Sequence, residues 1–205
     1  MIAVVDYGVG NLFSLTCSLS AVGAEAVVTS DAGEIACADG VILPGVGAFG
    51  DACGKLRSSG LESVVKDVAA SGRPLLGICL GMQMLFERSL EYGVHDGLGL
   101  LRGEVVPFRL PPEYKIPHMG WNSLRFVKDS PLLRYVREGE YVYYVHSYYA
   151  SECEDSIAAA SEYGGITVPG LVGRDNVFGT QFHPEKSGAV GLNILRAFNE
   201  LCAPR

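Results

Sequence analysis

Short apolar runs alternate with amphipathic stretches through the first part of the chain. Each apolar run suits a buried strand, and each intervening stretch carries apolar residues at helical spacing. The predicted strands are Ile2–Val5, Ala26–Thr29, Gly40–Leu43 and Pro74–Leu76. The predicted helices are Leu12–Val22 (ended by Gly23), Asp31–Cys37, Gly50–Arg57 and Leu61–Ala70. This alternation predicts an α/β fold with a mostly parallel central sheet and helices on both of its faces.

The pattern changes after about Tyr92. A glycine-rich loop leads into short runs with period-two alternation, which is typical of antiparallel strands. These runs are Glu104–Phe108, Ser123–Val127, Tyr141–Val145, Ser156–Ser161, Thr167–Gly173 and Val177–Phe182. Arg174-Asp175-Asn176 links the last two like a hairpin turn, and Gly188–Cys202 is a closing helix. We expect one domain over residues 1–205, with antiparallel strands added to the sheet in the C-terminal half.

The composition mainly excludes certain classes of protein and ligand. A hydrophobic content of 48% with 19% charged residues is typical of a globular protein, and the net charge of −7 argues against nucleic acid as the main ligand. The six cysteines show no metal-ligand spacing, and such scattered thiols suit a reducing cytosol. We expect no signal peptide at the N-terminus, and no apolar run approaches the ~20 residues of a membrane helix. A cytoplasmic protein is therefore expected.

The candidate chemistry centres on Cys79. Gly77 and Gly81 flank it, a short apolar strand precedes it, and Leu80, Met84 and Glu87 fall at helical spacing after it. A sharp strand-to-helix turn of this kind is the geometry of a nucleophile elbow, here with cysteine. The helix N-terminus favours negative charge and so favours a thiolate. The alternative is a small buried cysteine in a core strand.

A cysteine nucleophile needs a base, and the base needs an orienting group. His183 follows a predicted buried strand, and Glu185 lies two residues further on. In extended backbone these two side chains would point to the same side, so the carboxylate could hold the imidazole in one tautomer. His118 and His146 suit hydrogen-bonded structural roles, and His95 lies in the glycine-rich loop.

Two glycine-rich turns follow predicted strands. Pro44–Phe49 stands where an open α/β sheet builds a ligand crevice, and its backbone N–H groups could stabilise an oxyanion. An ordinary tight turn is the alternative. Gly8 and Gly10 resemble the start of a dinucleotide-binding loop, but Phe13 stands where the third glycine belongs. We therefore interpret that turn as one that closes over a site or a partner surface.

With these residues in place, the chain resembles the triad-type (class I) glutamine amidotransferases. The matching segments span nearly the whole chain and include Gly77–Gln83 and Gln181–Ser187. Three further segments are Asp6–Asn11, Pro117–Asn122 and Val145–Tyr149, together with the turn Pro44–Phe49. They are most similar to the branch of the family that serves histidine biosynthesis. The resemblance implies a three-layer fold, a glutaminase activity, and neither a cofactor nor a metal.

The resemblance also implies a role for individual residues. Cys79 would attack the glutamine amide, His183 would transfer protons, and Glu185 would orient His183. The oxyanion hole would be formed by backbone N–H groups of Leu80 and of Val46 or Gly47. Glutamine would be held by Gln83 and by the backbone around Ser147 and Tyr148.

A partner is implied as well. In this branch of the family, a separate cyclase subunit with a (β/α)₈ barrel receives the ammonia, so a heterodimer is expected. The positions that would face this partner near the ammonia exit are Asn11, Trp121, Tyr143 and Lys186.

Three other interpretations stay open at this point. A peptidase or deglycase of similar fold would typically carry histidine after the nucleophile, where this chain has Leu80. A glutaminase subunit of another pathway, such as pyridoxal phosphate synthesis, would be expected to differ in the turn Pro44–Gly47. A binding or regulatory protein with a degenerate site is the third, although all three triad positions are filled.

Overall fold

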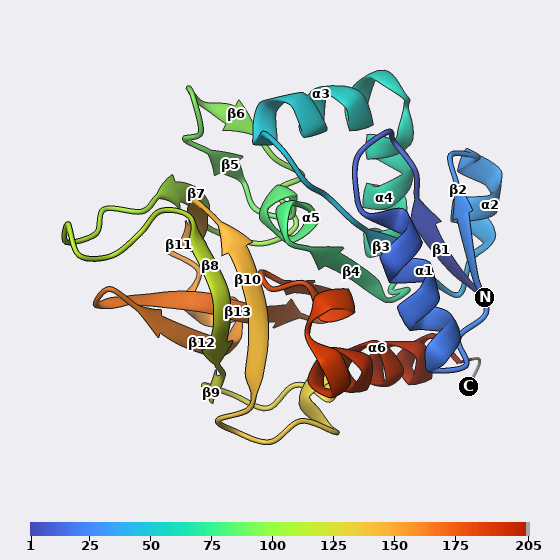
Figure 1. The fold of residues 1–205 in the computed structure, drawn as a ribbon. Helices are drawn as coiled ribbons and strands as arrows, with labels where there is room; N and C mark the ends of the chain where they lie inside the picture. The colour runs from blue at the N-terminus through green and yellow to red at the C-terminus, as the bar shows by residue number, and fades with distance from the viewer. Residues whose placement is uncertain (204–205) are drawn as a thin grey trace.

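The computed structural model describes residues 1–203, and its central feature is an eight-stranded sheet of order β2-β1-β3-β4-β14-β13-β12-β9 (Figure 1). The first five strands in this order are mutually parallel, and the last three continue the sheet in antiparallel pairing. The parallel strands are β2 (Ala26–Thr29), β1 (Ile2–Val5), β3 (Gly40–Leu43), β4 (Leu75–Ile78) and β14 (Val177–Thr180). The antiparallel strands are β13 (Ile166–Arg174), β12 (Ile157–Tyr163) and β9 (Arg125–Phe126). The predicted α/β fold with a mostly parallel sheet is confirmed.

Helices cover both faces of this sheet because its strands are apolar on both sides. Alternate residues of β1 enter different cores: Ala3 and Val5 lie in one cluster, Ile2 and Val4 in the other. The first cluster lies under α2 (Ala32–Cys37), α3 (Phe49–Ser58), α4 (Leu61–Ala70) and α5 (Leu80–Met84). The second lies under α1 (Leu12–Ala21) and α6 (Gly188–Cys202). The result is three layers.

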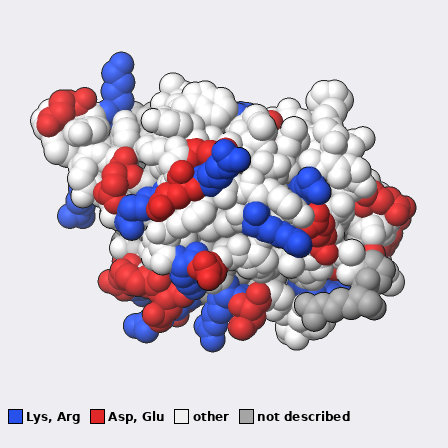
Figure 2. Space-filling view, turned by 90° about the horizontal axis from the view of Figure 1, so that it is seen from below, with Lys and Arg blue, Asp and Glu red and all other residues white. Residues whose placement is uncertain are grey.

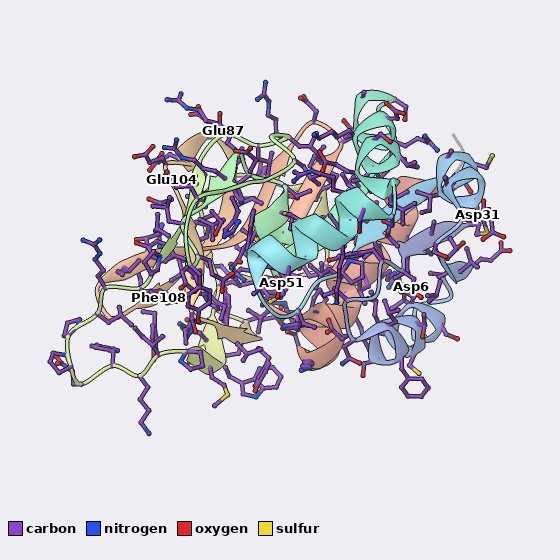
Figure 3. All side chains as sticks on the ribbon, turned by 90° about the horizontal axis from the view of Figure 1, so that it is seen from above. Asp6, Asp31, Asp51, Glu87, Glu104 and Phe108 are labelled. Carbon is purple, nitrogen blue, oxygen red and sulfur yellow. The ribbon has the colours of Figure 1, made fainter. Side chains whose placement is uncertain are left out.

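Local signals in the sequence account for several helix ends. Asp31 caps α2, and its side chain accepts a hydrogen bond from the N–H of Glu34 at 2.8 Å (Figure 3). Gly23 follows α1 with φ +73°, the left-handed conformation that commonly ends a helix. The closing helix has the predicted bounds, Gly188–Cys202.

The second half of the chain differs from the prediction, because not all of its strands join the central sheet. A two-stranded ribbon pairs β10 (Tyr141–His146) with β8 (His118–Ser123). A separate four-stranded sheet has the order β11-β7-β5-β6 (Figure 1). Its strands are β11 (Tyr148–Ser151), β7 (Glu104–Pro107), β5 (Arg88–Ser89) and β6 (His95–Asp96). The predicted strand Ser123–Val127 is interrupted at Leu124, whose N–H bonds to the carbonyl of Glu140. The 3₁₀ turns are η1 (Pro131–Leu133), η2 (Glu154–Ser156) and η3 (Pro184–Lys186).

The helix after Cys79 is also shorter than predicted. It ends at Met84 and does not reach Glu87. From Glu87 onward the backbone bonds to distant segments, since the N–H of Glu87 donates to Gly103 and its carbonyl accepts from Gly97. These tertiary hydrogen bonds occupy the backbone groups that a further helical turn would need, so α5 ends at Met84.

The surface carries mixed charge. Figure 2 shows Lys and Arg side chains interspersed with Asp and Glu on one face of the molecule. Among residues 1–203, no helix combines the length and apolar character needed to cross a membrane.

The close approach of α5 to the sheet depends on two glycines. A Cβ at Gly81 would lie only 1.9 Å from the carbonyl oxygen of Leu43 in β3, and a Cβ at Gly77 would lie 2.6 Å from the carbonyl oxygen of Gly81. Both contacts are with backbone atoms, which cannot move aside as a side chain can. Glycine is therefore required at both positions to seat the residue between them.

We expect Gly81→Ala to lower the free energy of unfolding by roughly 2–4 kcal/mol, because the added methyl group overpacks a rigid backbone contact. Gly54→Ala is the matched control, since its Cβ meets nothing within 4 Å on the exposed side of α3. It should stabilise by about 0.5–1 kcal/mol through helix propensity. Urea denaturation measures both. Equal stability of the two variants would contradict this account of the turn.

Candidate functional site

Three neighbouring parallel strands, β3, β4 and β14, direct the candidate residues to one edge of the sheet. The turn beginning at Pro44 follows β3, Cys79 follows β4, and Gln181 to His183 follow β14. The carboxyl ends of parallel strands build the ligand crevice of open α/β sheets. Residues that are far apart in the sequence thus meet because their strands are adjacent.

Cys79 occupies a strained turn between β4 and α5. Its backbone has φ 55° and ψ −110°, a conformation that residues other than glycine rarely adopt and that costs of order 1–3 kcal/mol. The N–H of Cys79 donates to the carbonyl of Thr180 at 2.7 Å, and its carbonyl accepts from Gln83 as α5 begins. The side chain therefore stands at a helix N-terminus, as the elbow interpretation predicted.

His183 and Glu185 form a buried pair. Their side chains are 4% and 3% exposed, and Nδ1 of His183 lies 2.8 Å from Oε1 of Glu185. The predicted contact is present, but the local structure is not the extended backbone that was expected. Glu185 lies in η3, and this tight turn brings its carboxylate back to the ring.

The pKa of His183 is raised to about 10. Burial by itself lowers this pKa, but hydrogen bonds and charge interactions with Cys79 and Glu185 outweigh the effect of burial. The imidazolium form is therefore favoured beside the sulfur of Cys79. Such a pairing suits a nucleophile and an acid–base group that work together.

The backbone of His183 is tied to the ribbon. Its N–H donates to the carbonyl of Tyr143 at 3.0 Å. The hydroxyl of Ser187 donates to the carbonyl of His183 at 2.6 Å and accepts from the N–H of Tyr143 at 3.0 Å. These bonds fix the position of the histidine relative to β10.

A cavity of about 320 Å³ opens in front of Cys79. Its lining includes all of the predicted nucleophile, oxyanion and glutamine-binding residues, together with the predicted base: Val46, Gly47, Cys79, Leu80, Gln83, Ser147, Tyr148 and His183. Leu80 is the first residue of α5, so its N–H has no partner within the helix. Gly47 has φ +92°, which glycine alone adopts readily.

Gln83 is buried at the base of this cavity. Its amide nitrogen Nε2 donates to the carbonyl of Tyr148 and to Oε1 of Gln181, both at 2.9 Å. Nε2 of Gln181 lies 3.9 Å from the sulfur of Cys79. Gln83, Gln181 and Tyr148 thus form a polar network that joins α5, the end of β14 and the start of β11.

The sequence analysis missed two residues of this region. Gln181 is fully buried, and its signal was a polar side chain in an apolar strand, two residues before His183. Glu91 also lines the cavity, and its carboxylate accepts a hydrogen bond from the N–H of Phe49 at the start of α3. Nothing in the spacing of the glycine-rich segment singled out Glu91.

The predicted partner residues lie beside the site. Trp121 is opposite Tyr143 in the ribbon, with their ring centroids 6.0 Å apart, and Nζ of Lys186 is 6.0 Å from the centre of the Tyr143 ring. Trp121 is 56% exposed. Asn11 lines a small cavity with His183 and Glu185 behind the nucleophile.

The three other histidines occupy different environments. His118 and His146 are buried in the ribbon, and burial lowers the pKa of His118 to about 4 and that of His146 to about 3. Neither pKa suits a base that is to be charged at neutral pH. His95 lies in β6, where its ring approaches Gly50 of α3.

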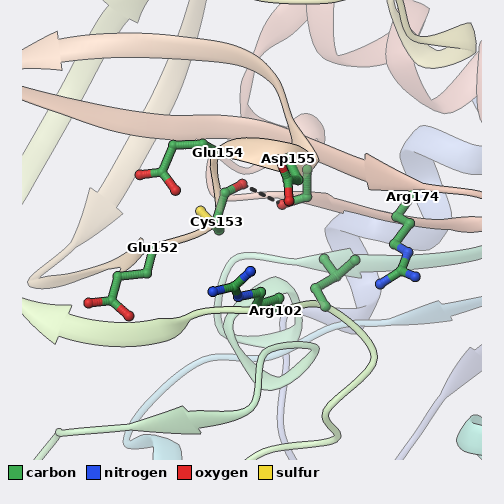
Figure 4. A pocket seen from close by; sticks show the side chains of 8 residues that line it. Arg102, Glu152, Cys153, Glu154, Asp155 and Arg174 are labelled. Carbon is green, nitrogen blue, oxygen red and sulfur yellow. Dashed lines mark hydrogen bonds between the residues drawn. The ribbon is translucent and has the colours of Figure 1, made fainter.

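A larger cavity, of about 750 Å³, shares no residue with the one at Cys79. Figure 4 shows its labelled side chains: Arg102 and Arg174 line this cavity together with Glu152, Glu154 and Asp155. Among residues 1–203, no three His, Cys, Asp or Glu side chains cluster closely enough to hold a metal ion.

Comparison with known proteins agrees with the fold. Residues 3–200 match the family model described as glutamine amidotransferase class-I, and the chain belongs to this family. Two solved structures share the fold. One is described as a glutamine amidotransferase, with a TM-score of 0.76 and 20% identity over 98% of this chain and 99% of that chain. The other is a chain of PurLQS from Thermotoga maritima, with a TM-score of 0.70 and 21% identity over 96% of each chain.

Relatives of known name are much more similar in sequence. Imidazole glycerol phosphate synthase subunit HisH of Geobacillus thermodenitrificans is 54% identical, over 97% of this chain and 94% of the relative. The subunit of the same name from Listeria monocytogenes is 49% identical over 98% and 96%. That from Bacillus cereus is 54% identical over 97% and 93%.

We expect Glu185→Gln to lower the pKa of His183, because the substitution removes the negative charge that helps to raise it. The fraction of His183 in the imidazolium form at neutral pH should fall. NMR titration of the imidazole signals measures this directly. Glu25→Gln, which removes the same charge from an exposed position, should leave His183 unchanged. An unchanged pKa in Glu185→Gln would remove Glu185 from its orienting role.

Proposed function

We propose that this chain is the glutaminase subunit of an imidazole glycerol phosphate synthase, and that it hydrolyses glutamine to glutamate and ammonia. The observation that carries the proposal is the placement of Cys79, at a helix N-terminus, beside a buried His183–Glu185 pair in an open cavity. Relatives about half identical over nearly the whole chain favour this subunit over a glutaminase of another pathway or a peptidase.

The reaction proceeds in two halves. The thiolate of Cys79 attacks the side-chain carbonyl carbon of glutamine, and the resulting tetrahedral intermediate collapses to a thioester. His183, as imidazolium, gives its proton to the departing ammonia. Neutral His183 then takes a proton from a water molecule whose oxygen attacks the thioester, and the second tetrahedral intermediate expels the sulfur as a thiolate. This step releases glutamate, whose new carboxylic acid loses its proton to water, and restores the thiolate–imidazolium pair. Glu185 holds the ring in one tautomer and stabilises its charged form.

The negative oxygen of each intermediate needs hydrogen-bond donors. The N–H of Leu80 is available at the start of α5, and the turn after β3 supplies the N–H of Val46 or Gly47 from the other side of the cavity. We assign the oxyanion hole to these groups.

Glutamine is held by both its ends in this proposal. Gln83 and the backbone at Ser147 and Tyr148 line the cavity beside the nucleophile and contact the substrate. The carboxylate of Glu91, at the cavity wall, is suited to the positively charged α-amino group of a free amino acid. A peptide-bound glutamine lacks that charge, so the free amino acid is the favoured substrate.

A second subunit is part of the proposal. Free ammonia in neutral water is mostly protonated and loses its nucleophilicity, so delivery inside a complex is needed. We propose a heterodimer with a cyclase of (β/α)₈ fold that converts a phosphoribulosyl-formimino acceptor into imidazole glycerol phosphate and an aminoimidazole carboxamide ribotide. The aromatic pair of Trp121 and Tyr143, with Lys186 and Asn11, is suited to the docking face. The six unpaired cysteines support a cytoplasmic location.

Cys79→Ser should reduce glutamate production by roughly 10³-fold or more, since a hydroxyl is far less acidic than a thiol and His183 alone does not activate it enough. Folding should be unchanged because serine has nearly the same volume. Cys17→Ser, at an exposed position of α1, is the control and should keep full activity. A glutaminase assay with thermal melting separates the two effects. An active Cys79→Ser variant would refute the assignment of the nucleophile.

The acceptor bound to the cyclase should raise glutamine turnover in the complex, because coupling the two sites prevents release of ammonia that cannot be used. The measurement is steady-state glutamate formation by the isolated chain, by the complex, and by the complex with an acceptor analogue. Lys186→Ala should weaken this coupling, whereas Lys66→Ala on α4 should not. Equal rates in all three states would contradict the coupling.

A further inference from the structure

Two buried histidines that the proposed reaction does not use face each other across the ribbon. His118 of β8 is directly opposite His146 of β10, and Nδ1 of His118 lies 2.9 Å from Nε2 of His146. At one end, Nδ1 of His146 lies 2.8 Å from the carbonyl oxygen of Tyr148. At the other, Nε2 of His118 lies 3.3 Å from the amide nitrogen of Asn122. We call this series, from Asn122 to the Tyr148 carbonyl, the histidine bridge.

The hydrogens of the histidine bridge can be assigned from its two ends. The carbonyl of Tyr148 can only accept, so Nδ1 of His146 carries a hydrogen and its Nε2 accepts. Nδ1 of His118 must then donate, and Nε2 of His118 accepts from the amide of Asn122. The orientation of that amide is fixed, because its oxygen accepts from the N–H of Ser123 at 2.9 Å. Every donor in the bridge therefore points toward Tyr148.

The assignment requires both imidazoles to be neutral, and their surroundings favour that state. The ring of His118 is stacked between Tyr144 and Tyr163, with centroids 4.7 and 4.0 Å away. Phe108, seen beside the ribbon in Figure 3, packs against both histidines. The positive charge on His183 further lowers the pKa of His146. An aromatic enclosure of this kind disfavours an imidazolium ion.

One end of the histidine bridge reaches the cavity in front of Cys79, and the other end lies on β8, the strand that carries exposed Trp121. The carbonyl of Tyr148 also accepts a hydrogen bond from Gln83, so it organises the base of the cavity in front of Cys79. At the opposite end, side chains alternate across β8: His118 and Asn122 point inward, whereas Met119 and Trp121 are 64% and 56% exposed. The strand that carries the donor end therefore also presents the exposed aromatic face.

We propose that Asn122, His118 and His146 are positioning residues that hold the Tyr148 carbonyl, and through it Gln83, in the arrangement that binds glutamine. The identity of the ligand rests on the function proposed above. The direction of the hydrogen bonds does not.

The decisive variant is Asn122→Asp, which has the same shape but offers only acceptor oxygens. The carboxylate demands a hydrogen on Nε2 of His118, which reverses the bridge and leaves Nδ1 of His146 and the Tyr148 carbonyl as two facing acceptors. Asn122→Ala is the matched control, since it removes the donor without imposing the reversal. Both are made in the Cys79→Ser background, so that glutamine binding is measured by calorimetry without turnover.

We expect Asn122→Asp to weaken glutamine binding about tenfold or more and Asn122→Ala by less than about threefold, because only the aspartate leaves two acceptors facing each other at the Tyr148 carbonyl, which bonds to Gln83. Nitrogen NMR of the imidazole rings should show hydrogen on Nδ1 of both histidines in the unsubstituted chain, and on Nε2 in Asn122→Asp.

Hydrogen on Nε2 in the unsubstituted chain, or equal glutamine affinity of the two variants, would overturn the proposal. Failure of the Cys79→Ser chain with Asn122 intact to bind glutamine would instead refute the proposed function. In that case the NMR result still decides the direction of the bridge.

Discussion

The close packing of α5 against the sheet is the constraint on which the site depends. A Cβ at Gly81 would collide with the backbone of β3 and a Cβ at Gly77 with the backbone of α5, so the turn between the two glycines is held in one place. Cys79 alone in that turn adopts a strained positive φ. The surrounding contacts must offset this strain, and in return the sulfur stands clear of the sheet at the N-terminus of a helix. A looser packing would let the backbone relax and would move the nucleophile.

The rest of the site is assembled around this fixed point from two different sheets. β14 lies next to β4 in the central sheet and delivers Gln181 and His183 beside the sulfur. The ribbon of β8 and β10 approaches from outside that sheet, and Tyr143 bonds to the backbone of His183 and to Ser187. Movement of the ribbon relative to the central sheet would therefore alter the acid–base group and the cavity wall together. A partner docked on the ribbon, as proposed above, would have a physical route to the acid–base group through this connection.

The three buried histidines lie close together, yet the pKa of one is raised and the pKa values of the other two are lowered. His183 gains a carboxylate and a sulfur as neighbours, and these raise its pKa in spite of burial. His118 and His146 are enclosed by aromatic rings and neutral hydrogen-bond partners; burial lowers the pKa of each, and the positive charge on His183 lowers that of His146 further. The site thus keeps one imidazole ready to carry a proton and two that remain neutral connectors. The difference arises from the neighbours and not from the depth of burial.

The sequence by itself determined the order of strands and helices through β4, the elbow at Cys79 and the pairing of His183 with Glu185. Each of these rests on local signals: apolar runs, glycines at fixed spacing, and a histidine and a carboxylate two residues apart in the sequence. Only the tertiary structure decided that Gln181 and Glu91 lie at the site, that β8 and β10 form a separate ribbon, and that α5 stops at Met84. Even the His183–Glu185 contact, predicted from extended backbone, is made through a 3₁₀ turn. These features depend on hydrogen bonds between residues distant in sequence, such as those of Glu87 with Gly97 and Gly103, and local patterns carry no information about which distant partner a backbone group will find.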